Sequence, residues 1–74
     1  MTELDEIVKY LQHRLLLNNH LQDKIKASAY AEAIKPINEA FNTDYEIEGL
    51  YKLKFENLAA LTEFSKTLPL RRRQ

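Results

Sequence analysis

The sequence contains no cysteine, no tryptophan, one glycine and two prolines among its 74 residues. The lack of cysteine excludes disulfides and thiolate metal sites, which stabilise many chains of this size. One glycine is too few for the glycine-rich loops that cradle phosphates. The longest apolar run, LAAL at Leu58–Leu61, falls far short of the ~20 residues that span a bilayer. We therefore expect a cytoplasmic protein with no metal, no cofactor and no membrane contact.

The chain also lacks an excess of either charge, because 11 Lys and Arg balance 11 Asp and Glu. A balanced chain has no overall attraction for nucleic acid or for an anionic membrane. Hydrophobic residues make up 45% of the sequence and charged residues 30%, which is typical of a folded domain. A chain of this length encloses one small core. We expect a single globular domain over residues 1–69 and a basic tail over residues 70–74.

The first half of the chain contains two helical patterns. Thr2 and Asp5 have the spacing of a capping box, and apolar residues follow at helical intervals. Asn18-Asn19 interrupts this pattern, so we expect the first helix to end there. A second helix is expected at roughly residues 20–41, where the stretch ASAYAEAI has high intrinsic helix propensity.

Residues 45–55, YEIEGLYKLKF, alternate apolar and polar side chains with an exception at Gly49. The alternation and the β-favouring residues predict a short β-ribbon. In a hairpin the glutamates before the glycine face the lysines after it, with Glu46 opposite Lys54, so that opposite charges pair across the strands. A single bent strand explains the alternation equally well but does not explain the order of the charges.

The predicted fold class is therefore α+β. It consists of two N-terminal helices, the ribbon at about 45–55 and a C-terminal helix at about 57–68. Asn57 is the expected N-cap of the last helix, and Pro69 supplies its stop. An all-α three-helix domain is the alternative.

Side chains suited to catalysis are scarce. The serines and threonines do not stand in a strand-turn-helix elbow, and His13 and His20 are interpreted as solvent-facing. A chain this short has little material with which to enclose a cleft for acid–base chemistry. We expect no enzyme activity, no catalytic residue and no small-molecule substrate.

The predicted ribbon suggests a mode of binding. A two-stranded ribbon is marginal in water, and its unpaired edges are templates for another chain. We expect pairing with a second copy, as a two-fold homodimer, or with a strand of another protein. The predicted contact residues are Tyr45, Ile47, Tyr51, Leu53 and Phe55. The expected function is a small protein–protein interaction module that regulates, inhibits or completes a larger assembly.

Nucleic-acid binding is the alternative function. Arg71, Arg72 and Arg73 form a compact basic cluster that suits phosphate or an acidic partner. The first two helices, joined at Asn18-Asn19, have the order of a helix-turn-helix. Three arginines are nevertheless fewer than the roughly 5–8 basic residues usual in such patches, and a charged tail can serve solubility alone.

Overall fold

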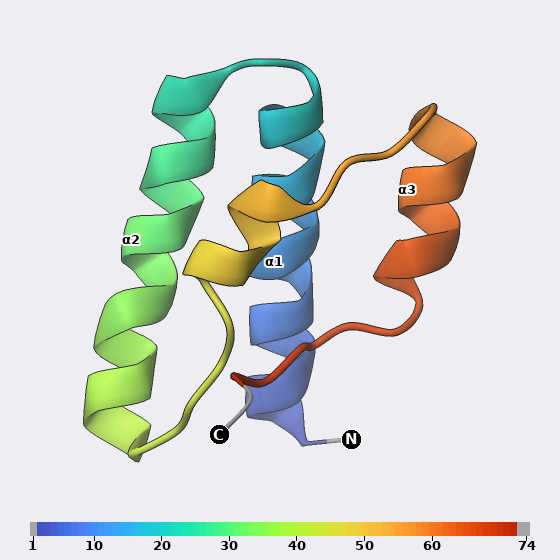
Figure 1. The fold of residues 1–74 in the computed structure, drawn as a ribbon. Helices are drawn as coiled ribbons and strands as arrows, with labels where there is room; N and C mark the ends of the chain where they lie inside the picture. The colour runs from blue at the N-terminus through green and yellow to red at the C-terminus, as the bar shows by residue number, and fades with distance from the viewer. Residues whose placement is uncertain (1, 73–74) are drawn as a thin grey trace.

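The computed structural model describes residues 2–72, and within them the chain forms helices and no β-sheet (Figure 1). The elements are α1 (Glu3–His20), α2 (Lys24–Phe41), the 3₁₀ helix η1 (Glu48–Lys52) and α3 (Leu58–Ser65). Figure 1 shows α1 between α2 and α3, with η1 lying across α1, and all three neighbours pack against this central helix. The predicted α+β class is therefore wrong, and the all-α three-helix alternative is confirmed.

The helix α1 begins with the predicted capping box. The Thr2 hydroxyl accepts a hydrogen bond from the Asp5 amide at 3.1 Å, and the Asp5 carboxylate accepts one from the Thr2 amide at 3.4 Å. The helix does not end at Asn18-Asn19 but continues to His20. The side chain of Asn18 is buried, and its Nδ2 donates to the carbonyl of Arg14 at 2.8 Å. This bond within the helix satisfies a polar group that would otherwise favour a cap.

The connection between α1 and α2 lies at residues 21–23. Gln22 has a left-handed backbone conformation with a φ of 63°. Asp23 is the N-cap of α2, because its carboxylate accepts a hydrogen bond from the Lys26 amide at 3.1 Å. The two helices run antiparallel (Figure 1), whereas the helices of a helix-turn-helix meet at about 90–120°. The arrangement is an αα-hairpin.

Residues 45–55 form no β-ribbon. Ile47 and Leu50 are buried, and Leu53, which follows at the same spacing, is half-buried against the core. This spacing matches the 3.0 residues per turn of a 3₁₀ helix. The alternating pattern leaves Leu50 among the charged side chains, and this is the position at which the strand interpretation fails.

Glu46 does not face Lys54 across a strand. Its Oε1 accepts hydrogen bonds from the amides of Ile47 and Gly49 at 3.1 and 3.0 Å, at the start of η1. The carboxylate of Glu46 therefore holds main-chain amides at the start of η1 and does not pair with a lysine. Within residues 2–72 there is no ribbon edge, so the expected pairing of two copies through such an edge has no structural basis.

The last helix begins as predicted at its N-cap, Asn57, whose Oδ1 accepts from the Ala60 amide at 2.9 Å. It ends at Ser65, earlier than expected, and the chain then returns across α1 (Figure 1). There Arg71 forms an isolated antiparallel β-bridge with Tyr45. None of the helices in the described part of the chain is both long and apolar enough to cross a membrane.

Candidate functional site

The five residues predicted to bind a partner occupy two environments. Tyr45 and Ile47 belong to the core. The other three, Tyr51, Leu53 and Phe55, are half-buried and pack against that core. Contact with a partner therefore stays a prediction for Tyr51, Leu53 and Phe55, whose side chains keep some exposed surface.

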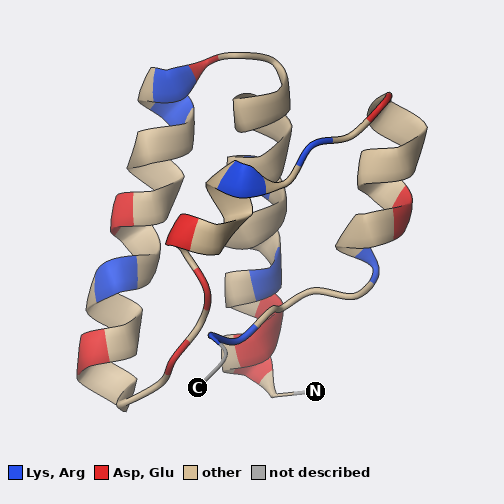
Figure 2. Ribbon diagram, in the orientation of Figure 1, with Lys and Arg blue, Asp and Glu red and all other residues tan. Residues whose placement is uncertain are grey.

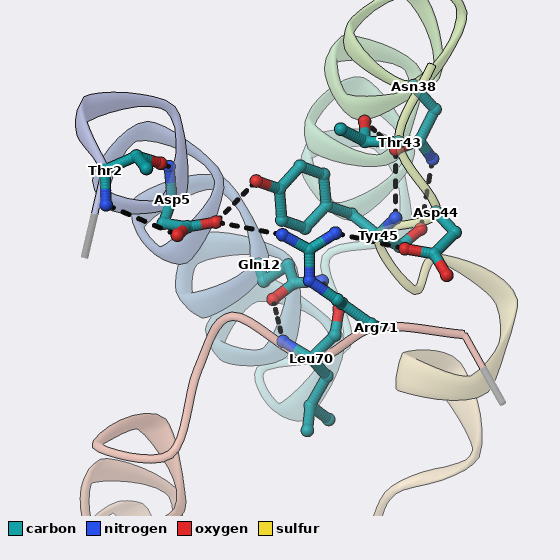
Figure 3. A network of polar contacts seen from close by, with 9 residues as sticks. All are labelled: Thr2, Asp5, Gln12, Asn38, Thr43, Asp44, Tyr45, Leu70 and Arg71. Carbon is teal, nitrogen blue, oxygen red and sulfur yellow. Dashed lines mark hydrogen bonds and ion pairs between the residues drawn. The ribbon is translucent and has the colours of Figure 1, made fainter. Parts of the chain in front are cut away.

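Leu70 and Arg71, at the start of the predicted basic tail, lie against α1 and the segment that precedes η1 (Figure 3). The Glu46 amide donates to the Leu70 carbonyl at 2.9 Å, and the Arg72 amide donates to the Asp44 carbonyl at 2.7 Å. These main-chain bonds produce the β-bridge. Arg73 lies outside the described residues, so the predicted contact there has no structural description.

Gln12 connects α1 to both segments of the bridge, through the residues next to Tyr45 and Arg71. Its side chain is 0% exposed. Nε2 donates to the carbonyls of Glu46 and Leu70, each at 2.9 Å, and Oε1 accepts from the Leu70 amide at 2.8 Å. Buried polar groups are unfavourable unless they are paired, so this set of bonds fixes both segments relative to α1.

Asn38 of α2 holds the neighbouring residue Tyr45. Its Oδ1 accepts from the Tyr45 amide and its Nδ2 donates to the Tyr45 carbonyl, both at 3.0 Å. The same Oδ1 accepts from the Thr43 hydroxyl at 2.9 Å. A side-chain amide thus supplies the donor and acceptor that a neighbouring strand would offer, and the extended residue needs no sheet.

Tyr45 also lies at the centre of a charged cluster (Figure 3). The guanidinium of Arg71 lies 4.6 Å from the centroid of the Tyr45 ring and pairs with Asp44 at 3.1 Å and Asp5 at 3.4 Å. The Tyr45 hydroxyl donates to the Asp5 carboxylate. This hydrogen bond holds the pKa of Asp5 below its usual value, while burial and the same bond raise the pKa of Tyr45. The charge of Arg71 is therefore compensated within the chain.

A groove of about 450 Å³ opens beside this cluster, between η1, α3 and the C-terminal segment. We call it the η1–α3 groove. Its lining residues are Glu46, Gly49, Leu50, Leu53, Phe64, Leu70, Arg71 and Arg72. Three residues predicted as contacts from the sequence, one leucine of the former ribbon and two arginines, thus meet in a single depression.

The charged side chains that line the η1–α3 groove differ in whether other groups of the chain already bind them. The carboxylate of Glu46 is occupied by two amides of η1, and Arg71 is paired with two aspartates. Arg72 is exposed, and it makes no ion pair with any residue in the range 2–72. The available charge at the rim of the groove is therefore the cation of Arg72.

A second groove, of about 340 Å³, lies between α1 and α3 and contains His13 and Ser65. The Nδ1 of His13 is 2.8 Å from the Ser65 hydroxyl oxygen. That hydroxyl donates its proton to the Leu61 carbonyl at 2.9 Å, so the imidazole must be the donor in the His–Ser bond. Burial and then the charge of Arg14 lower the pKa of His13. This half-buried histidine is not solvent-facing as predicted, and its bond to serine joins α1 to α3 and does not activate a nucleophile.

Two of the residues that organise this region, Gln12 and Asn38, are absent from the sequence-based predictions. Gln12 occupies a position of the apolar stripe, between Val8 and Leu15 at helical spacing. A polar residue inside such a stripe signals a buried hydrogen bond, although the sequence does not reveal its partner. No comparable signal marks Asn38.

Among residues 2–72, no group of three or more His, Cys, Asp or Glu side chains could hold a metal ion. No protein-family model matches the sequence, and comparisons with curated proteins and with solved structures gave no match. The geometry of the chain itself therefore carries the functional argument.

Proposed function

We propose that the protein is a non-enzymatic interaction module that binds an acidic, partly apolar peptide segment of a partner protein in the η1–α3 groove. The observation that carries this proposal is the joining of an apolar lining with an arginine rim in one depression. Binding of such a segment suits a regulator, an inhibitor or an accessory subunit of a larger assembly.

The apolar part of the groove supplies the affinity in this proposal. Its accessible apolar residues, Leu53, Phe64 and Leu70, come from three separate segments of the chain, while Leu50 is fully buried. The ring of Phe64 packs against Phe55 with centroids 5.4 Å apart, which supports one wall. Burying one leucine or phenylalanine side chain of a peptide contributes about 1.5–3 kcal/mol before the cost of association is subtracted, so two such residues support a weak, transient contact to which the arginine rim must add.

The arginine rim supplies the preference for an acidic partner. A guanidinium forms two parallel hydrogen bonds with a carboxylate, and Arg72 is exposed and available for such a contact. The surroundings oppose a long polyanion, because the acidic first turns of α1 lie beside the arginine segment (Figure 2). A peptide with one or two carboxylates therefore fits this charge pattern better than the phosphate backbone of a nucleic acid.

The test is a titration of ¹⁵N-labelled protein with two synthetic peptides followed by amide chemical shifts. Both peptides carry leucine and phenylalanine at the same positions, with glutamates in one and lysines in the other. We expect the glutamate peptide to shift the amides of Gly49, Leu53 and Phe64, and the lysine peptide to bind much more weakly. Equal binding of both peptides, or shifts that avoid the groove, would contradict the proposal.

A charge-reversal variant and a duplex DNA titration separate the two classes of partner. Arg72→Glu should weaken binding of the glutamate peptide, and Lys24→Glu, an exposed reversal outside the groove, should not. Binding of duplex DNA with an affinity that falls steeply with salt would instead support the nucleic-acid alternative.

A further inference from the structure

The helix α1 carries a second surface, which is half exposed at Ile7 and Tyr10 and which Tyr30 of α2 contacts at Tyr10 and Arg14. The surface consists of Glu3, Ile7, Tyr10 and Arg14, which are separated by four, three and four residues. This spacing places the side chains in one stripe along a helix. Ile7 and Tyr10 expose 53% and 57% of their surfaces. We call these four residues the α1 stripe; Leu17 and Leu21 continue its spacing towards the turn.

Arg14 stands out within the α1 stripe because it lacks a counter-charge. Its guanidinium lies 5.8 Å from the ring centroid of Tyr30 on α2, and Tyr10 packs edge-on against the same ring at 6.4 Å. Its Nε is buried without a hydrogen-bond partner. No carboxylate among residues 2–72 lies within ion-pair distance of it. A partly buried cation of this kind is stabilised by a carboxylate from another molecule.

We infer that the α1 stripe binds a second copy of the same chain, with the two α1 helices antiparallel about a two-fold axis. The stripe has an acidic end at Glu3 and a basic end at Arg14, so antiparallel pairing sets each of these residues opposite the other in the second copy. A two-fold axis repeats every contact, which gives two ion pairs. Antiparallel packing also places the helix dipoles in opposite directions.

The apolar residues of the stripe match each other in the same register. When Glu3 of one copy faces Arg14 of the second, Ile7 faces Tyr10 near the axis. The layers then follow the order ion pair, apolar, apolar, ion pair, and Leu17 and Leu21 lie outside these layers because α1 of the second copy begins at Glu3. The 18-residue helix is about 27 Å long. A contact along part of it lies at the small end of specific interfaces, so the dimer should dissociate on dilution.

Sedimentation equilibrium over a concentration series tests the inference. The wild-type chain should pass from 8.7 kDa to twice that mass as concentration rises. Glu3→Arg and Arg14→Glu should each weaken self-association by about tenfold or more, because each places like charges opposite one another. An equimolar mixture of the two variants restores both ion pairs and should dimerise as the wild type does.

Matched variants control for general effects of charge and for folding. Glu56→Arg and Lys54→Glu reverse exposed charges outside the stripe and should leave the dimer unchanged. Ile7→Lys tests the apolar layer without touching the ion pairs, and it should also dissociate the dimer. Thermal unfolding followed by circular dichroism shows whether each variant is folded.

Three results would overturn the inference. A single 8.7 kDa species throughout the series would exclude this dimer. A dimer that tolerates both reversals would use another surface. Failure of the mixture to recover, with both variants folded, would show that Glu3 and Arg14 do not face each other.

Discussion

Gln12→Met tests whether one buried amide holds the C-terminal segment in place. Methionine has a similar length and shape, so the change removes hydrogen bonds while it leaves little empty space. The amide of Leu70 and the carbonyl of Glu46 lose their side-chain partner, whereas the Leu70 carbonyl keeps its bond from the Glu46 amide. Two main-chain groups are thus left unpaired next to a fully buried side chain.

The expected loss follows from these two groups. An unpaired buried donor or acceptor costs about 1–3 kcal/mol, so we expect the free energy of unfolding to fall by about 2–4 kcal/mol after partial compensation by the apolar side chain. A domain of this size has a total stability of about 3–5 kcal/mol, so Gln12→Met should be close to unfolded at 37 °C. Urea unfolding followed by circular dichroism measures the change.

A control and a second variant sharpen this test. Ser28→Met, on the exposed face of α2, introduces the same side chain and should change stability by less than about 0.5 kcal/mol. Gln12→Glu keeps one acceptor but turns the second oxygen towards two carbonyls, which raises the pKa of the new carboxyl group. Because the folded state then binds the proton more tightly, this variant should be most stable in acid and lose stability as the pH rises through that raised pKa. A loss below about 1 kcal/mol in Gln12→Met would refute the reasoning, since it would mean that the segment rearranges freely.

Three further predictions concern the surroundings of the site. Tyr45→Phe removes the hydrogen bond to the carboxylate of Asp5 and should lower the free energy of unfolding by about 1.5 kcal/mol in urea titrations; an unchanged midpoint would contradict this. Because the pKa of His13 is lowered from 6.5, the unfolded chain binds more protons around that value, so stability should fall as the pH drops below about 6.5, and His13→Gln should show a flatter profile. Gly49→Ala places a Cβ only 3.0 Å from the carboxyl carbon of Glu46, and it should destabilise the protein and shift the amide signals at the start of η1.

The helices that could be predicted from the sequence are those with local signals. Thr2 and Asn57 bond to amides a few residues away, so the residues that specify these helix starts are adjacent in the chain. The end of α1 was misplaced because Asn18 bonds within the helix to the Arg14 carbonyl, which an asparagine pair does not reveal.

The ribbon prediction failed for a different physical reason. Over one short segment, periods of two and three both place Ile47 and Leu53 on the buried side, and Leu50 is the residue that separates them. The main-chain groups of the extended residue Tyr45 bond to the side chain of Asn38, and those of its neighbours bond to the returning chain at residues 70 and 72. Both partners are supplied by tertiary structure, so local propensity could not predict them.

The sequence predicted single residues of the candidate site but not the way in which the fold brings them together. Leu53 and Arg72 were each named as contacts, the former as part of a strand and the latter as part of a free tail. Their meeting in one groove depends on the return of the chain after α3, which Gln12 fixes by bonds to residues far away in the sequence. No pattern in the sequence specifies that return.

The most direct test of the proposed function is a calorimetric charge swap at the rim of the η1–α3 groove. The glutamate and lysine peptides are each titrated into the wild type and into Arg72→Glu. We predict that the wild type prefers the glutamate peptide and that Arg72→Glu reverses this preference, each by up to about tenfold, because attraction to one peptide and repulsion of the other each contribute about 0.2–1 kcal/mol at an exposed site. Equal affinities of the two proteins for both peptides would contradict the claim that this groove binds acidic segments.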